Sequence, residues 1–217
     1  GVCGIDEDFA TVPAGAALDY HASKVLAEQD LLHLYGSLET VILRPTITYG
    51  PGDRDGMITR MVQMIRRQRL PRIGLGNNFL HLTFISDMVD AIIAACTRAR
   101  IHKAVYNVCG PEPIRLNDLA RGIAVMVEKP FPPFSIPRAV AYSAGWLLEM
   151  AYRLPGSNSI LPHTPLITRQ MVNSLSANRG FSGEKARREL GFMPGVNLTE
   201  GLQATLAWMR NEGIYPS

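Results

Sequence analysis

Short apolar segments that alternate with helical ones constrain the fold of this chain more than any other feature of its sequence. Apolar residues recur at helical spacing from Asp19 to Tyr35, and the β-branched run Thr40 to Pro45 is typical of a short buried strand. A helix, strand, helix, strand and helix are then expected over 57–68, 81–86, 87–97, 104–110 and 116–127. Helices that alternate with buried strands are typical of parallel sheets. The sequence therefore predicts an α/β fold built on a parallel sheet.

The second half of the chain is mostly helical in its patterning. After a Pro-rich stretch, helices are expected over 138–154, 164–172, 182–191 and 197–213. Each of the last three carries end signals, which are Thr164 with Pro165, Ser182 with Gly191, and a capping box of Asn197 with Glu200. The segment Gly74 to Phe79 has a GxG but precedes a strand and opens no helix, so we interpret it as a loop.

Composition excludes several classes of protein. With 217 residues, 47% of them hydrophobic and 19% charged, the chain is globular and large enough to bury a core. The net charge of +3 is spread along the sequence, so we expect no nucleic-acid partner. The five histidines show no metal-ligand spacing, and no apolar run is long enough to span a bilayer. The three cysteines form no CxxC motif and cannot all pair, which argues against a disulfide framework. A reducing compartment fits this pattern, so we expect a cytoplasmic protein.

Tyr20 and Lys24 form the strongest candidate for a catalytic pair. At positions i and i+4 of a helix, their side chains share a face. A free tyrosine has a pKa near 10, so its phenol stays protonated at neutral pH. A neighbouring ammonium lowers that pKa because it stabilises the phenolate. A tyrosine tuned in this way can exchange a proton with an alcohol or a ketone. The alternative, a chance YxxxK on an ordinary helix, stays open on this motif alone.

The motifs that follow the pair resemble a known family. Ser23 makes the pair YxxSK, and "LRP" (43–45), "TYGPGD" (48–53), "FISDMVDAIIAA" (84–95) and "VYNVCGPEP" (105–113) come in order. This order, over most of the chain, resembles the extended short-chain dehydrogenase/reductase family, also called the NAD-dependent epimerase/dehydratase family. The pattern "RPTITYGPGD" is most similar to the branch of 3β-hydroxysteroid and sterol dehydrogenases.

The resemblance implies roles for particular residues. Tyr20 would be the acid/base, and Lys24 would hold the nicotinamide ribose of NAD or NADP. Pro45, Thr46 and Ile47 would lie along the nicotinamide, and Ile47, Tyr49 and Leu80 would contact the substrate. Asp87 matches an Asp of the family, although a carboxylate in the first turn of a helix explains it better. No metal is implied.

The resemblance also implies a division of the chain. Residues 1–110 would be the remaining part of a Rossmann-type NAD(P)-binding domain, with the loop 51–80 contributing to the substrate side. Residues 111–217 would form a smaller, mostly helical substrate-binding region. The Gly-rich phosphate loop of the family is missing, and "GVCG" (1–4) resembles the end of the segment that carries the catalytic Ser or Thr. We therefore expect an N-terminally truncated chain whose upstream Ser or Thr lies just before Gly1.

Two positions at which this chain departs from the nucleotide-sugar members of the family indicate the substrate class. Nucleotide-sugar members carry an Asn and an Arg at the positions of Ile47 and Leu80, and a buried diphosphate needs such donors. We therefore predict an NAD(P)-dependent oxidoreductase that interconverts a secondary alcohol and a ketone on an apolar or steroid-like small molecule. A nucleotide-sugar epimerase or dehydratase is the alternative, and a catalytically incompetent fragment is the third reading.

The apolar helix expected over 138–154 has three readings. It packs in the core, walls an apolar substrate pocket, or rests on a membrane surface with Trp146 at the interface, in that order of preference. The family resemblance also leaves a homodimer of the full-length protein open.

Overall fold

The computed structural model describes residues 3–9, 20–34, 39–98, 101, 103–131, 135–152 and 168–214, apart from the side chains of residues 3, 20, 21, 170, 171, 174 and 175. The helices are α1 Tyr20–His33, α2 Met57–Arg66, α3 Ile85–Thr97, α4 Leu116–Met126, α5 Arg138–Tyr152, α6 Arg169–Ser176 and α7 Leu198–Asn211, with a π-helical turn η3 at Ala186–Leu190. The strands are β1 Cys3–Ile5, β2 Val41–Pro45, β3 Ile47–Tyr49, β4 Arg72–Ile73, β5 Phe79–Leu80, β6 Leu82–Phe84, β7 Ala104–Val108, β8 Ile114–Arg115, β9 Ser135–Ile136 and β10 Gly180–Phe181.

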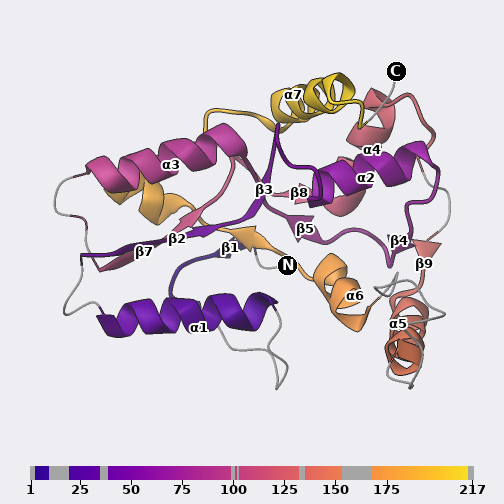
Figure 1. The fold of residues 1–217 in the computed structure, drawn as a ribbon, viewed down its shortest axis with the longest axis horizontal. Helices are drawn as coiled ribbons and strands as arrows, with labels where there is room; N and C mark the ends of the chain where they lie inside the picture. The colour runs from indigo at the N-terminus through magenta and orange to yellow at the C-terminus, as the bar shows by residue number, and fades with distance from the viewer. Residues whose placement is uncertain are drawn as a thin grey trace.

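The strands pair mainly in parallel, as the alternating pattern predicts. The pairs β1–β10, β2–β7, β3–β6 and β4–β9 are parallel, and β5–β8 is antiparallel. In the longest pair, Val41 lies opposite Ala104 and Pro45 opposite Val108. Figure 1 shows α3 on one side of β2–β7 and α1 on the other, with β1–β10 between β2–β7 and α1. The predicted α/β class is confirmed.

The main core joins the two halves of the chain. Buried side chains of β3, α2, β5 and β6 pack against those of α4 and α7, and the group consists of Tyr49, Ile58, Met61, Val62, Ile65, Leu80, Leu82, Leu119, Ala120, Ile123, Ala124, Val127, Leu202, Leu206 and Met209. Figure 1 shows α2, α4 and α7 together at one end of the molecule, with α5 and α6 below them. The division of the chain near residue 110 stays a prediction, and the core crosses that position.

Two helix ends follow the signals in the sequence. The side chain of Asn197 accepts a hydrogen bond from the Glu200 amide at 3.0 Å, and Gly191 ends η3 in the left-handed conformation with a φ of 68°. The helix predicted at 182–191 is present over residues 184–190, and Ala186–Leu190 within it have π-helical geometry. Helix α3 starts at Ile85, two residues before the predicted Asp87. Thr164 and Pro165 lie outside the described residues.

Asp87 has the structural role that the sequence favours. It lies in the first turn of α3 and is buried, with 2% of its surface exposed. Its carboxylate accepts hydrogen bonds from the amides of Gly195 and Val196, at 3.0 and 3.4 Å. These bonds fix the turn that leads into α7. Helix α7 in turn covers Tyr49, whose ring packs edge-on against Phe84 with centroids 5.5 Å apart.

A pair of helix glycines tests this packing. A Cβ added at Gly201 of α7 would lie 2.2 Å from the Tyr49 hydroxyl, whereas one at Gly122 of α4 would meet nothing within 4 Å. We expect Gly201→Ala to lower the free energy of unfolding by about 1–3 kcal/mol through overpacking. Gly122→Ala, the matched control, should raise it by about 0.5–1 kcal/mol because alanine favours a helix. Urea unfolding of both variants measures the difference, and equal effects would contradict the packing described.

Candidate functional site

The predicted acid/base pair lies at the start of α1. Tyr20 is the first residue of the helix and Lys24 lies one turn later, with its side chain exposed. The side chain of Tyr20 lies outside the described residues. Positions 20, 24 and 28 follow one another at i, i+4 and i+8, so the helix brings them to neighbouring places on one side. The contact that Glu28 makes therefore sets the orientation of that side of the helix.

Arg44 of β2 forms an ion pair with Glu28. The guanidinium meets the carboxylate with two parallel hydrogen bonds, Nε to Oε2 at 3.0 Å and Nη2 to Oε1 at 2.5 Å. Both side chains are largely buried, with 22% and 14% of their surfaces exposed. A two-bonded Arg–carboxylate pair has a defined geometry as well as a favourable charge interaction. It fixes the rotation of α1 relative to the carboxyl end of β2.

The same guanidinium ties down the segment after β1. Nη1 of Arg44 donates to the carbonyl of Glu7 at 3.0 Å, and the Glu7 carboxylate accepts from the Asn107 amide at 2.7 Å. The Asn107 side chain, buried in β7, donates to the carbonyls of Ile5 and Ser182 at 3.2 and 3.4 Å. One polar network therefore joins α1, β2, β7, the β1 segment and β10. We refer to Glu7, Glu28, Arg44 and Asn107 as the polar clamp.

The residues predicted to lie along a nicotinamide follow β2 directly. Pro45 is exposed at the end of the strand. The Thr46 amide donates to Val108 O at 3.0 Å, and its hydroxyl lies 2.6 Å from that of Thr83. The Ile47 amide donates to His81 O at 3.2 Å. Backbone bonds on both sides hold this segment, so Pro45 presents a rigid apolar surface at the carboxyl end of the parallel pair.

His81 connects separate segments of the fold, a role that the sequence did not indicate. Its ring is buried, with Nε2 2.9 Å from Gly110 O and Nδ1 accepting the Phe181 amide at 3.2 Å. Because a carbonyl can only accept and an amide can only donate, the ring is neutral with its proton on Nε2. Burial lowers the pKa of His81, although the hydrogen bonds to Gly110 and Phe181 act in the opposite direction. His81 therefore connects Ile47 with the end of β7 and with β10.

Two predicted substrate contacts lie deep in the core. Tyr49 and Leu80 expose 3% and 1% of their surfaces, and both belong to the main core. Burial, followed by the charge of Asp87, raises the pKa of Tyr49 to about 12, so its phenol stays protonated. Ile47 is half-buried and lies closer to the surface. The assignment of all three residues to the substrate stays a prediction.

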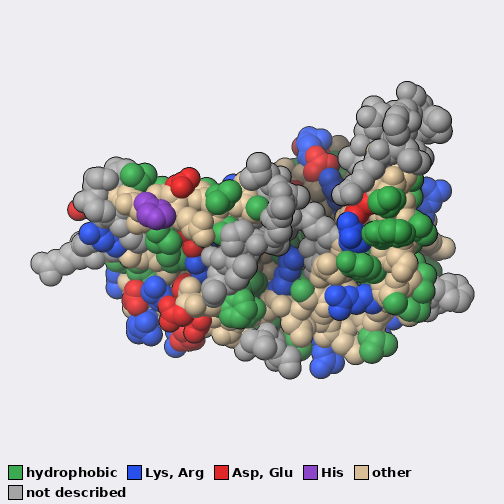
Figure 2. Space-filling view, turned by 90° about the horizontal axis from the view of Figure 1, so that it is seen from below, with side chains coloured by type: hydrophobic (Ala, Val, Ile, Leu, Met, Phe, Trp, Pro, Cys, Tyr) green, Lys and Arg blue, Asp and Glu red, His purple; other side chains and the backbone are tan. Residues whose placement is uncertain are grey.

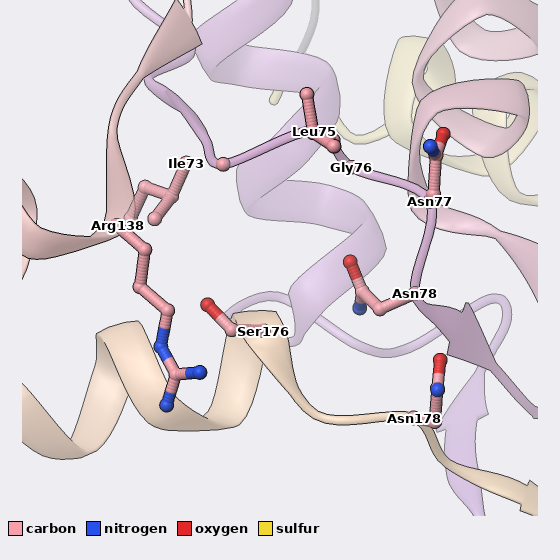
Figure 3. A pocket seen from close by; sticks show the side chains of 9 residues that line it. Ile73, Leu75, Gly76, Asn77, Asn78, Arg138, Ser176 and Asn178 are labelled. Atoms are coloured by element: carbon pink, nitrogen blue, oxygen red, sulfur yellow. The ribbon is translucent and has the colours of Figure 1, made fainter. Parts of the chain in front are cut away.

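A cavity of about 430 Å³ opens beside this region, between the loop after β4 and the end of α6. Its lining is more apolar than polar, but five polar side chains surround the space in Figure 3, those of Asn77, Asn78, Asn178, Ser176 and Arg138. Backbone and side-chain bonds fix its walls, including Asn78 to Ala177 O at 3.3 Å. The cavity suits a ligand with hydroxyl, amide or anionic groups.

Helix α5 presents an apolar outer face. Val140, Trp146, Leu147 and Met150 each expose 45–60% of their surfaces. Figure 2 shows hydrophobic side chains gathered at the side of the molecule where α5 lies, with Lys and Arg between them. None of the described helices combines the length and apolarity that a membrane crossing requires. Peripheral membrane contact, a homodimer and a cytoplasmic location stay predictions.

Sequence reasoning found the segments but not the contacts between them. Glu28 continues the stripe of Tyr20 and Lys24 by one more turn, and Arg44 is the one charge in the apolar run "TVILRP". A charge in a buried strand needs a partner, so this pair was the available signal. His81 carried no such signal, because both its ring partners are backbone groups distant in sequence. Among the described residues, no group of three or more metal-ligating side chains is placed to hold a metal.

Comparison with known proteins adds independent information. The profile described as "NAD dependent epimerase/dehydratase family" matches residues 2–109. The chain is 31% identical over 192 residues to a 2-alkyl-3-oxoalkanoate reductase of Stenotrophomonas maltophilia, covering 85% of this chain and 56% of that protein. It is also 31% identical over 206 residues to a decarboxylating sterol-4-alpha-carboxylate 3-dehydrogenase of Schizosaccharomyces pombe, covering 89% and 57%. The chain thus spans little more than half the length of these relatives.

Solved structures agree on the fold. A nucleoside-diphosphate-sugar epimerase from Pseudomonas aeruginosa superimposes with a TM-score of 0.76 at 20% identity, covering 99% of this chain and 63% of that one. At this identity the likeness concerns the fold alone. The expected Rossmann-type architecture and the similarity to sterol dehydrogenases are both confirmed.

The polar clamp predicts a stability difference between ion pairs. We expect Arg44→Met to lower the free energy of unfolding by about 2–4 kcal/mol, because it leaves the Glu28 carboxylate largely buried and unpaired. Arg187→Met is the matched control, because the Arg187–Glu184 pair is 3.9 Å apart and mostly exposed. That variant should change stability by less than about 1 kcal/mol. Chemical unfolding compares the two, and a charge-reversed pair, Glu28→Arg with Arg44→Glu, should recover part of the loss.

The neutral ring of His81 predicts a dependence on pH. Its pKa is lowered in the folded chain, so the unfolded chain binds a proton at higher pH than the folded one. Stability conferred by the neutral ring is therefore present at pH 7 and lost as the pH falls below about 6.5. We expect His81→Gln to be less stable than the parent chain at pH 7 but to lose less stability between pH 7 and pH 5. His33→Gln, on the exposed end of α1, should keep the original slope, and identical slopes in all three chains would contradict this role.

Proposed function

This chain belongs to the NAD dependent epimerase/dehydratase family, and from that premise we propose that it serves the NAD(P)-dependent interconversion of a secondary alcohol and a ketone. The family consists of enzymes, and its cofactor is NAD. The proposed substrate is a 3-hydroxy acid or the corresponding 3-oxo acid with a large apolar body. Tyr20 is the proposed acid/base, and Lys24 orients the cofactor.

The observation that carries the proposal is the pair Glu28–Arg44. It holds the side of α1 that bears Tyr20 and Lys24 against the carboxyl end of β2, where Pro45 to Ile47 begin. In parallel α/β folds, ligands bind beyond the carboxyl ends of the strands. This contact supports the proposal that the candidate acid/base pair and the expected nicotinamide surface act together, although they are 21 or more residues apart in sequence.

The residues in place fit a nicotinamide nucleotide. Pro45 offers an exposed apolar surface at the strand end, and the backbone groups of Thr46 and Ile47 are already satisfied by Val108 and His81. Lys24 reaches out from α1 and would hold the ribose hydroxyls. When bound, the oxidised cofactor accepts a hydride from the carbon of the alcohol. The chain's own part is to take the hydroxyl proton onto the Tyr20 phenolate oxygen, and to return it in the reverse direction.

The two relatives support the choice of substrate class. One acts, by its name, on a 2-alkyl-3-oxoalkanoate and the other on the 3-position of a sterol 4-carboxylate. Both names describe a carboxylate two bonds from the reacting carbon, on a large apolar molecule. The half-buried Ile47 agrees with such a body, and neither Ile47 nor the buried Leu80 supplies a donor for a diphosphate.

A nucleotide-sugar epimerase or dehydratase is the second candidate. The cavity beside α6 favours it, because Asn77, Asn78, Asn178 and Ser176 offer many hydrogen-bonding groups to a sugar nucleotide. The same groups equally suit a polar substituent on an apolar substrate. The absence of charged donors at Ile47 and Leu80 places this candidate second.

Turnover tests the proposed function. We expect oxidation of 3-hydroxydecanoate or of a 3β-hydroxysteroid with NAD⁺ or NADP⁺, followed by the absorbance of the reduced cofactor. Tyr20→Phe and Lys24→Met should each lower the rate by about 100-fold or more, because the proton carrier or the group that positions it is lost. Tyr142→Phe, on the exposed side of α5, should leave the rate unchanged. Epimerisation of a UDP-sugar without oxidation of either alcohol would favour the second candidate instead.

A further inference from the structure

One cation lines the cavity between the loop after β4 and the end of α6. It is Arg138, the exposed first residue of α5, whose side chain runs along the cavity in Figure 3. Its Nη2 donates to the side-chain oxygen of Asn173 at 3.2 Å. That partner is neutral, and no carboxylate of the described residues pairs with the guanidinium. Because a guanidinium has five N–H donors, Arg138 keeps most of them for an anion at the cavity.

Two asparagine side chains in the cavity wall have fixed orientations. Oδ1 of Asn178 accepts the Phe79 amide at 2.9 Å, and Nδ2 of Asn78 donates to Ala177 O at 3.3 Å. A backbone amide can only donate and a carbonyl can only accept, so Asn178 offers a ligand its NH₂ group and Asn78 offers its carbonyl oxygen. Ser176 adds a second acceptor, because its hydroxyl proton is donated to a backbone carbonyl of α6 at 2.7 Å.

The protein itself holds the loop wall of the cavity in place. The Gly74 amide donates to Ile136 O at 2.8 Å, and the Asn117 amide donates to Gly76 O at 3.0 Å. Gly76 has a φ of 62°, and a Cβ there would collide with the Asn117 side chain, so the loop requires a glycine at this position. A preformed wall lowers the entropic cost of binding. The volume of about 430 Å³ also lies within the range of small-molecule sites.

The polar groups of the cavity together define the chemistry of a ligand. Arg138 and the NH₂ group of Asn178 require acceptors, and a carboxylate or a phosphate supplies these with a complementary charge. Asn78 and Ser176 require donors. Hydroxyl groups supply such donors without the positive charge of an ammonium, which Arg138 would repel. The inventory therefore matches a molecule that has both an anionic group and hydroxyl groups.

We propose that this cavity binds an anionic small molecule that carries hydroxyl groups, and that Arg138 is the residue that binds its anion. Hydroxy acids and sugar phosphates share this chemistry. Asn178 supports Arg138 as a second donor, and Asn78 and Ser176 accept hydrogen bonds from the hydroxyl groups. The inference concerns binding alone and goes beyond the proposed oxidation, because it requires neither a cofactor nor the roles of Tyr20 and Lys24.

Calorimetric titration with matched probes tests the inference. Glucose 6-phosphate and glucuronate carry an anion and hydroxyl groups, glucose carries only the hydroxyl groups, and inorganic phosphate and acetate carry only the anion. We expect at least one charged sugar to bind about 10- to 100-fold more tightly than glucose, the range expected for a charge-assisted hydrogen bond. That sugar should also bind at least about tenfold more tightly than its bare anion, because it fills the acceptor sites as well. The tighter of the two charged sugars identifies the anion as a phosphate or a carboxylate.

Three variants and a control locate the site. Arg138→Gln should remove the preference for the charged sugar and change binding of glucose by less than about threefold. Arg138→Lys should fall between, because lysine keeps the charge but loses the planar fork. Ser176→Leu fills the cavity without changing the charge, so it should weaken binding of every sugar. Arg60→Gln, on the exposed side of α2, is the control with the same change in charge, and it should leave all titrations unchanged.

Thermal unfolding without ligand checks that the variants fold, and Arg138→Gln and Arg60→Gln should each shift the unfolding temperature by less than about 2 °C. Failure of both charged sugars to bind more tightly than glucose would overturn the proposal. An equal loss of affinity in the Arg138→Gln and Arg60→Gln chains would do the same, and so would undiminished binding by a folded Ser176→Leu chain. The titrations use no turnover, so failure of the proposed oxidation would leave their result standing.

Discussion

The arrangement of this molecule depends on the hydrogen bonds that the guanidinium of Arg44 makes. This guanidinium is largely withdrawn from water in a short parallel strand, so its hydrogen-bonding groups must be met within the protein. They are met by Glu28 of α1 and by the carbonyl of Glu7. Three segments that are far apart in sequence are thereby held at one strand end. The position of the candidate catalytic helix follows from this requirement.

Two basic side chains near that strand end illustrate two solutions to burial. Arg44 is charged and paired with a carboxylate. His81 is neutral, and backbone groups satisfy both of its ring nitrogens. Both solutions leave the buried polar groups hydrogen-bonded, as buried polar groups in native proteins generally are.

Local features of the chain could be predicted because their causes are local. The alternation of apolar patterns, the cap at Asn197 and the left-handed Gly191 depend on residues a few positions apart, and the structure confirms them. The π-helical turn at Ala186–Leu190 could not be predicted, because its backbone differs from an α-helix by one hydrogen-bonding step. The contacts of His81 span 29 and 100 residues, and nothing in the neighbouring sequence indicates them.

The sequence by itself determined the class of the fold and the candidate pair Tyr20–Lys24, because helical spacing and strand composition are written into short stretches of chain. The tertiary structure alone decided that Glu28 faces Arg44, and that Tyr49 and Leu80 lie in the core. The physical reason is that a side chain's surroundings depend on which distant strands pair. In this chain, the parallel pairing β1–β10 brings Cys3–Ile5 beside Gly180–Phe181, from opposite ends of the sequence.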